Sequence, residues 1–298
     1  MGIDALLALG ADTLVPLSSL TSFQVGGAAD LVLTPADYGV LAEAVRICTL
    51  CGIPYTLLGK GTNVLAADDG FRGLILRFDT PTHPPVWEGT TVTVCAGTSL
   101  LALARESVQR GLSGLERLCG IPGTVGGACA MNAGAYGAEL KDVLRRVRVL
   151  RQGEIQWLDV GSDDMGYRCS RFSFPACIVL EAALSLQKDD GTALATLRDC
   201  MQKRREKQPL EFPSAGSTFK RPQGYFAGAL IEQCGLKGYR IGGAQVSEKH
   251  AGFVVNVGDA TAADVSALIA HIQATVFKST GVLLECEIKR IGEELCIY

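Results

Sequence analysis

The sequence is poor in charged residues and in histidine. The low charge narrows the classes of function that the protein can have. Charged residues make up 20% of the 298 residues, the formal net charge is −3, and there are three histidines. A nearly neutral chain lacks the basic footprint of a nucleic-acid-binding protein. With 48% hydrophobic residues, the chain can bury a large core, and its length predicts about two or three domains.

The N-terminus lacks the features of a targeting segment. MGIDALLALGADTLV is apolar, but it contains Asp4 and Asp12 and has neither a basic start nor a small-residue cleavage site. The sixth residue is Leu6, where a myristoylation signal would have Ser or Thr. We therefore expect a cytoplasmic protein that binds neither a membrane nor nucleic acid.

Neither disulfides nor a metal site are predicted. The eleven cysteines are scattered singly, which is typical of reduced thiols in a cytosolic protein. Cys48 and Cys51 have the spacing of a metal or redox motif, but no second pair accompanies them, and His83, His250 and His271 are distant in the sequence. Because Cys48 continues the apolar stripe of a predicted helix, we expect it to pack in the core.

A βαβ module is predicted at residues 31–59. LVLTP and IPYTLLG are typical of strands, Asp37 can cap the helix between them, and Gly52 suits its C-terminal end. GKGTN at 59–63 follows the second strand. Because glycine accepts positive φ, such a loop can turn its backbone N–H groups toward a phosphate.

The glycine pattern after this strand is not that of a Rossmann fold, because Thr62, Asn63 and Val64 follow Gly61 where a third glycine should open a helix. Residues 64–78 instead predict two strands around the turn at Asp68-Asp69-Gly70. A plain hairpin is therefore the alternative to a phosphate-binding loop.

The segment GIPGTVGGACAMNAGAYG, at 120–137, holds six glycines and no charge. Its length would allow a membrane span, but Pro122, Asn132 and the glycines make a poor lipid-facing helix. Two interpretations stay open: a tight crossing in the core, or a wall that exposes backbone amides to a large, flat, anionic ligand. Together with GKGTN, it suggests a dinucleotide held from both sides.

Further along, residues 81–204 combine short strands with a helix, which indicates an α+β layer domain. Residues 203–240 hold eight basic residues against three glutamates, a local charge of +5. A closing helix is predicted between Thr261 and Gly281, with His271 on its solvated side. Nucleic-acid binding by the basic segment is disfavoured because its aromatic residues form no recognisable motif.

The combination of motifs resembles one family. They are LGKGTNVL at 58–65, GLSGLERLCGIPGTVGGACAMNAGAYG at 111–137, GYRCSRF at 166–172, AGSTFKRP at 215–222, GAQVSEKHAGFVVN at 243–256 and LECEIKRIG at 284–292. In this order, they are similar to the UDP-N-acetylenolpyruvoylglucosamine reductases, the MurB family of peptidoglycan synthesis. The short separation of Arg168 from Ser217 resembles the variety without an extra tyrosine-bearing loop.

The resemblance implies an α+β protein with a two-part FAD-binding region of the vanillyl-alcohol-oxidase/PCMH type and a C-terminal substrate-binding domain. It implies an FAD-binding subdomain at 1–79, a second at 80–203 and a UDP-sugar domain at 204–298. FAD would be held without a covalent bond, NADPH would be the co-substrate, and a monomer is expected. The implied FAD contacts are Gly59, Lys60, Gly61, Thr62, Asn63, Val64, Gly120, Ile121, Pro122, Gly123, Thr124, Gly126, Gly127, Ala128 and Lys289.

The resemblance also implies three catalytic residues, whose chemistry suits the reduction of an enolpyruvyl ether. Arg168 can grip a carboxylate and stabilise charge as it develops. Ser217 can protonate a strongly basic carbon, and it occupies the motif position that Ser214 does not. Glu287 can orient the arginine, and the motif favours it over Glu285.

The basic segment then gains a use, because a UDP-sugar carries two phosphates. We expect substrate contacts from Lys207, Lys220, Arg221, Gln245 and Asn256. Two alternatives remain from other classes: an FAD-dependent oxidase with the same cradle, and a non-catalytic flavin or nucleotide-sugar binding protein.

Overall fold

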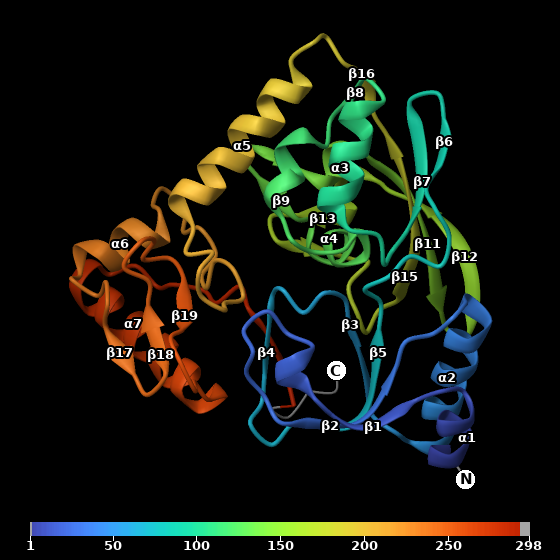
Figure 1. Ribbon diagram of the computed structural model, residues 1–298, viewed down its shortest axis with the longest axis horizontal. Helices are drawn as coiled ribbons and strands as arrows, with labels where there is room; N and C mark the ends of the chain where they lie inside the picture. The colour runs from blue at the N-terminus through green and yellow to red at the C-terminus, as the bar shows by residue number, and fades with distance from the viewer. Residues whose placement is uncertain (1, 293–298) are drawn as a thin grey trace. The chain divides into compact units, whose positions relative to one another are not determined.

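The chain forms two compact units, each built from three segments that alternate along the sequence. The computed structural model describes residues 2–292. Unit 1 takes the described residues of Met1–Asp12, Leu31–Lys60 and Gly73–Arg204, and unit 2 those of Thr13–Asp30, Gly61–Arg72 and Arg205–Tyr298. Figure 1 shows the course of the chain. The division into three domains stays a prediction, although its last boundary, after residue 203, lies next to a change of unit.

The first half of the chain, through the glycine-rich stretch, contains these elements: α1 (Gly2–Ala8), β1 (Asp12–Pro16), η1 (Leu17–Ser19), β2 (Ala28–Leu33), α2 (Tyr38–Cys51), β3 (Tyr55–Leu58), β4 (Val64–Ala66), β5 (Phe71–Arg77), β6 (Val86–Glu88), β7 (Thr91–Cys95), α3 (Leu100–Gln109), β8 (Leu112–Ser113), η2 (Glu116–Gly120), α4 (Val125–Met131), β9 (Gly134–Ala135) and β10 (Ala138–Glu139).

The second half continues with η3 (Leu140–Asp142), β11 (Leu144–Arg151), β12 (Glu154–Asp159), η4 (Ser162–Asp164), β13 (Met165–Gly166), β14 (Cys169–Ser170), β15 (Ile178–Ser185), β16 (Gln187–Lys188), α5 (Ala193–Lys207), α6 (Ala227–Gln233), β17 (Arg240–Ile241), β18 (Ala244–Val246), β19 (Val254–Asn256), α7 (Ala262–Thr280) and β20 (Lys289–Ile291). The mixture of helices with largely antiparallel strands confirms the α+β class.

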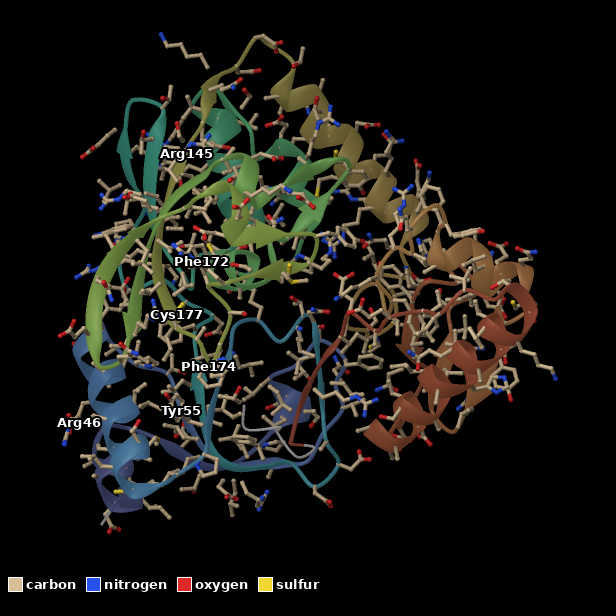
Figure 2. The ribbon with its side chains drawn as sticks, turned by 180° about the vertical axis from the view of Figure 1, so that it is seen from behind. Arg46, Tyr55, Arg145, Phe172, Phe174 and Cys177 are labelled. Carbon is tan, nitrogen blue, oxygen red and sulfur yellow. The ribbon has the colours of Figure 1, made fainter. Side chains whose placement is uncertain are left out.

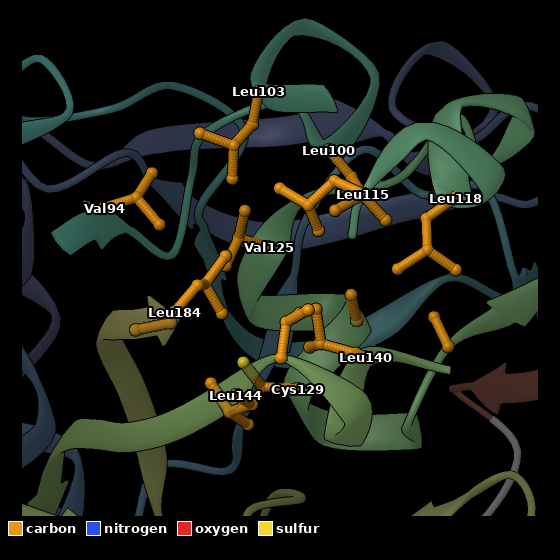
Figure 3. Packing of buried hydrophobic residues seen from close by; sticks show 14 of the residues in the cluster. Val94, Leu100, Leu103, Leu115, Leu118, Val125, Cys129, Leu140, Leu144 and Leu184 are labelled. Carbon is orange, nitrogen blue, oxygen red and sulfur yellow. The ribbon is translucent and has the colours of Figure 1, made fainter. Parts of the chain in front are cut away.

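An antiparallel sheet of order β12-β11-β15-β7-β6 is the frame of unit 1. The helices α3 and α4 lie on one face of it (Figure 1). Figure 3 shows their shared core, in which Leu100 and Leu103 of α3 meet Val94 of β7 and Leu184 of β15. Val125 and Cys129 of α4 belong to the same core, and all six side chains are at most 1% exposed, so this core fixes α4, the helix within the glycine-rich stretch.

The other core of unit 1 is built on the predicted βαβ module, whose strands and helix are confirmed. Asp37 accepts the Val40 N–H at 2.8 Å, and Gly52 ends α2 with a left-handed φ of 64°. β3 pairs in parallel with β5. Figure 2 shows Tyr55 of β3 beside Phe174, with ring centroids 5.4 Å apart in an edge-on arrangement.

The CxxC pair is split between core and solvent. Cys48 is 1% exposed, and its burial raises the pKa of its thiol to about 11, so that the thiol stays protonated at neutral pH. Cys51 is exposed. Within residues 2–292, no group of three or more His, Cys, Asp or Glu residues could hold a metal ion.

Unit 2 packs α6 and α7 with the sheet β17-β18-β19 around its own core. The closing helix is confirmed: Thr261 Oγ1 accepts the Asp264 N–H at 3.0 Å, and Gly281 is left-handed with a φ of 72°. Its predicted apolar face is buried throughout. His271 lies off that face but is half-buried, because it stacks on Tyr239 with ring centroids 4.3 Å apart.

The hairpin at the Asp68-Asp69-Gly70 turn was a wrong alternative, although both of its strands exist. β4 pairs in parallel with β20, far along the chain, while β5 belongs to the sheet of order β1-β2-β5-β3. The turn has another task, since the Asp68 carboxylate accepts the N–H groups of Ala262 at 2.7 Å and Ala263 at 3.0 Å. It caps α7 from outside the helix.

None of the described helices is both long and apolar enough to span a membrane.

We predict that Asp68→Ala weakens the start of α7 and lowers the free energy of unfolding by about 1 kcal/mol, because two amide groups lose a charged acceptor at the positive end of the helix. Urea unfolding gives the energy, and faster hydrogen exchange of the Ala262 and Ala263 amides locates it. Asp69→Ala is the matched control, since Asp69 is also exposed. Equal effects of the two substitutions would contradict the assignment.

Candidate functional site

The two glycine-rich loops approach each other within unit 1. A Cβ atom added to Gly59 would lie 2.8 Å from Thr124 Oγ1, closer than real Cβ contacts come. Only glycine at position 59 lets the end of β3 pass Thr124 undisturbed. The structure thus brings together two segments about sixty residues apart in the sequence.

Thr124 is fixed because it caps α4. Its Oγ1 accepts the Gly127 N–H at 3.2 Å. The first turn of α4 also docks on the chain after β7, where the Gly126 N–H donates to Ala96 O at 2.8 Å. A Cβ on Gly126 would lie 2.8 Å from the Ala96 Cβ, whereas one on Gly127 would be 3.5 Å from Thr124 Oγ1, an ordinary contact. Gly126 therefore serves packing, as the core interpretation expects, while Gly127 has space beside it.

This arrangement suits a dinucleotide. In the segments of unit 1 expected to hold it, Gly59–Lys60 and residues 120–128, the one charged side chain is Lys60. Backbone amides and small side chains form the remainder, which gives a flat ring system room to approach and offers a lysine and amide dipoles to two phosphates. These residues fit FAD.

Arg168 sits at the turn of the β13–β14 hairpin, which pairs Met165 with Ser170 and Gly166 with Cys169. Arg168 is half-buried and has a left-handed φ of 55°. That conformation costs a non-glycine residue about 1–2 kcal/mol, so the surroundings must hold it.

The guanidinium of Arg168 is held against the glycine-rich stretch. Its Nη2 donates to Gly134 O at 2.8 Å, and its carbon lies 5.0 Å from the centre of the Tyr167 ring. A Cβ on Gly134 would lie 3.1 Å from Arg168 Nη1 and 2.9 Å from Ala138 O. A side chain at position 134 would therefore clash with Ala138 O and crowd the guanidinium.

Ser217 and Glu287 are neighbours in unit 2. The residue after Ser217 is the fully buried Thr218, whose carbonyl accepts the Glu287 N–H at 2.9 Å. Ser217 itself is exposed, and Glu287 is half-buried. The two predicted residues therefore project from adjacent, hydrogen-bonded segments.

The remaining part of the first loop joins the same region of unit 2. β4 pairs with β20 so that Val64 is opposite Lys289, and the Lys289 N–H donates to Asn63 O at 3.0 Å. Asn63 Nδ2 donates to Glu287 O at 3.2 Å. Gly61 has a φ of 61°, and a Cβ there would lie 2.3 Å from Leu20 O.

The predicted substrate residues have different surroundings. Lys220 and Arg221 line a surface hollow of unit 2 with Gln223 and Tyr225. The Lys220 ammonium is paired with the Glu285 carboxylate, so the neighbour that could be mistaken for Glu287 already has a partner. Arg221 lies over the Phe226 ring, 3.9 Å from its centre.

Gln245 and Asn256 are engaged within unit 2, and Lys207 is the last residue of α5. Gln245 Nε2 donates to Gly238 O at 3.0 Å. Asn256 is 9% exposed; it donates to Phe23 O at 3.3 Å, and its Oδ1 accepts the N–H groups of Gly258 and Ala260. These bonds give Asn256 a structural task.

Two positioning residues were missed by the sequence prediction. Thr218 is 0% exposed, and its Oγ1 accepts the Val254 N–H at 3.0 Å. Asn132 is also 0% exposed and bonds to three segments. The signal for both was a polar residue within a small, apolar motif, where an unpaired group would be costly.

Comparisons with known proteins match almost the whole chain to one family. Residues 208–291 match the family model of the UDP-N-acetylenolpyruvoylglucosamine reductase C-terminal domain, and residues 29–159 match the FAD binding domain. The chain is 48% identical to the UDP-N-acetylenolpyruvoylglucosamine reductase of Exiguobacterium sibiricum over 94% of its length and 92% of the relative. It is 45% identical to that of Geobacillus kaustophilus, with the same two coverages of 94% and 92%.

A solved structure is similar too. It is the crystal structure of the UDP-N-acetylenolpyruvylglucosamine reductase (MurB) from Thermus caldophilus, with a TM-score of 0.80 and 34% identity. The match covers 94% of this chain and 98% of that one. With the matched FAD binding domain, these findings make FAD the cofactor.

We predict that Gly127→Ala weakens FAD binding about 10- to 100-fold without destabilising the flavin-free protein. A helical alanine is up to about 1 kcal/mol more favourable than glycine, and its Cβ meets no close protein atom. The clash, about 1–3 kcal/mol, would be with FAD alone. Fluorescence titration with FAD and urea unfolding measure the two effects.

Gly59→Ala is the contrasting variant, because its Cβ would displace Thr124. Both stability and FAD affinity should fall. An unchanged FAD affinity of Gly127→Ala would show that the start of α4 does not face FAD.

Proposed function

Because the chain belongs to the UDP-N-acetylenolpyruvoylglucosamine reductase family, we propose that it reduces UDP-N-acetylglucosamine enolpyruvate to UDP-N-acetylmuramate, using NADPH and FAD, in peptidoglycan precursor synthesis. The observation that carries the proposal is the 48% identity that extends over 94% of the chain. The matched family model of the C-terminal domain, at residues 208–291, includes the positions of Ser217 and Glu287. Nothing comparable supports an oxidase or a non-catalytic binding protein.

When bound, FAD would supply the hydride chemistry, with NADPH as the source of the hydride and the terminal alkene carbon of the substrate as its acceptor. This leaves negative charge on the adjacent carbon and, by conjugation, on the carboxylate. We assign the carboxylate to Arg168, since a guanidinium offers two charge-assisted hydrogen bonds. The bond from Nη2 to Gly134 O holds the guanidinium beside the glycine-rich stretch.

We propose that Ser217 donates the proton that the negatively charged carbon receives. A hydroxyl is a weak acid, so it can protonate only a strongly basic acceptor, and the charged carbon next to a carboxylate is one. Its exposed position gives a ligand access. Glu287, whose N–H is anchored to Thr218 O, is proposed to polarise the developing enolate through hydrogen bonds.

For the diphosphate, we propose Lys207, Lys220 and Arg221, with Gln245 adding a hydrogen bond. The hollow lined by Lys220 and Arg221 supports this part of the proposal, since it also offers the Gln223 amide and the Tyr225 ring. Asn256 is the last proposed contact, and its amide also donates to Phe23 O and accepts the N–H groups of Gly258 and Ala260.

We further propose that the protein acts as a cytoplasmic monomer. Its substrates are charged nucleotides, which a membrane retains inside the cell, and this supports the cytoplasmic location. Sedimentation of the flavin-loaded protein tests the oligomeric state.

The visible spectrum tests the proposed function. A flavin that bleaches with NADPH without oxygen, and regains its colour when UDP-N-acetylglucosamine enolpyruvate is added, supports the reductase. Recovery with oxygen alone would favour an oxidase, and a protein that cannot be loaded with FAD would overturn the proposal.

Ser217→Ala is predicted to keep bound FAD and its reduction by NADPH, but to lose reoxidation by the enolpyruvyl substrate by about 100-fold or more, because the proton donor is gone. Stopped-flow absorbance follows each half-reaction separately. Ser214→Ala, three residues earlier, is the matched control and should leave both rates unchanged. An equal loss of both half-reactions in Ser217→Ala would refute the proton-donor role.

A further inference from the structure

The side chain of Asn132 joins the glycine-rich stretch to the Arg168 hairpin. Asn132 ends α4 in a left-handed conformation, with a φ of 45°, and is 0% exposed. Its Nδ2 donates to Gly166 O at 2.9 Å and to Glu139 Oε2 at 3.0 Å. Its Oδ1 accepts the Lys141 N–H at 3.0 Å. Both amide hydrogens and the amide oxygen are therefore used.

These three bonds require an asparagine. An aspartate would bring a carboxylate oxygen against Gly166 O and Glu139, where both neighbours are acceptors. An aliphatic side chain would leave three partner groups, in a part-buried setting, without these hydrogen bonds, at about 0.5–1.5 kcal/mol each. Glycine would suit the left-handed backbone but would lose the bonds. The substitution Asn132→Gly therefore removes the side-chain hydrogen bonds while it keeps a residue that suits the backbone conformation.

Two links close a ring around Arg168. Asn132 holds the carbonyl of Gly166, two residues before Arg168, and Arg168 Nη2 holds the carbonyl of Gly134, two residues after Asn132. The hairpin connection is only two residues long. A shift of Gly166 would therefore move the turn and its strained arginine together.

The charged groups at this ring are arranged around Glu139. Its carboxylate receives Asn132 Nδ2 and is paired with Lys141 Nζ at 2.7 Å. A Cβ atom added to Gly134 would lie 3.0 Å from Glu139 Cγ and 3.1 Å from Arg168 Nη1. Glu139 and the guanidinium thus approach the same space beside Gly134, and Asn132 is one of the groups that hold the Glu139 carboxylate.

We propose that Asn132 is a positioning residue of the reduction, which sets the Arg168 guanidinium for the carboxylate of the enolpyruvyl substrate. The inference rests on the proposed function, since it needs Arg168 to act on that carboxylate. Asn132 works through Gly166 and Glu139 and touches neither substrate nor FAD. A displacement of about 1 Å in such a group costs about 100-fold in rate.

The test uses Asn132→Gly and Asn132→Asp in the flavin-loaded protein. Reoxidation of reduced flavin by the enolpyruvyl substrate should slow by about 10- to 100-fold, while reduction by NADPH should be unchanged because that step has no carboxylate to orient. The decisive comparison is made in the Arg168→Ala background. There, Asn132→Gly should have no further effect on reoxidation.

Glu181→Gln is the matched control for lost stability. Glu181 is 6% exposed in unit 1 and is bonded to Arg148 at 3.1 Å and His83 at 3.3 Å. Its loss should lower the melting temperature without changing either half-reaction.

A second measurement does not depend on turnover. In flavin-free protein, the Arg168 Nε–H resonance, assigned by its loss in Arg168→Ala, should shift in Asn132→Gly and stay in place in Glu181→Gln. An unshifted resonance, or an equal slowing by Asn132→Gly with and without Arg168, would overturn the positioning role. If the unmodified protein itself is not reoxidised by the substrate, the proposed function fails instead, and the resonance still tests the link between Asn132 and Arg168.

Discussion

The arrangement of unit 1 depends on close approach to a backbone that carries no side chains. Gly59 passes Thr124, Gly126 docks on Ala96, and Gly134 approaches Ala138 O, each at a distance that a Cβ would violate. These contacts cost the conformational entropy of flexible residues, about 0.5–1 kcal/mol for each glycine in a regular element. The antiparallel sheet and the core beneath α3 and α4 supply the stability that offsets this cost.

The glycine-rich stretch thus serves both of the purposes that the sequence left open. Gly126 is a packing residue, as a tight core crossing requires, and Gly127 stands one position further with room beside it. In a short helix, adjacent residues point in different directions. One face of α4 can therefore join the core while its neighbour stays available to FAD.

Local signals in the sequence predicted local structure well. Asp37 and Gly52 bound α2, and Thr261 and Gly281 bound α7, because capping uses groups a few residues apart. The pairing of β4 with β20 was missed, and a hairpin was the natural alternative, because strand partners are chosen over the whole chain. Asp68 was taken for a turn residue for the same reason: the helix that it caps begins at Ala262.

In the candidate site, too, motif positions were predicted from the sequence, whereas contacts between distant residues were not. Motif positions indicated Arg168, Ser217 and Glu287, and the structure adds what holds them: Gly134 at the guanidinium, and Thr218 between Ser217 and the Glu287 segment. Such supports need distances, which no spacing rule gives. Asn256 shows that a polar residue in such a motif can also have a structural task, since its side chain bonds to backbone groups of other residues.

The pairing of Lys220 with Glu285 does not conflict with a phosphate contact. The Glu285 side chain is 71% exposed, and an ion pair with such a partner contributes about 0–1 kcal/mol. A contact with a diphosphate is charge-assisted and can involve more than one oxygen. Exchanging the carboxylate for a phosphate is therefore cheap, and until the exchange the pair keeps the lysine beside the hollow. A lysine held in this way loses less side-chain entropy on binding than one that moves freely in solvent.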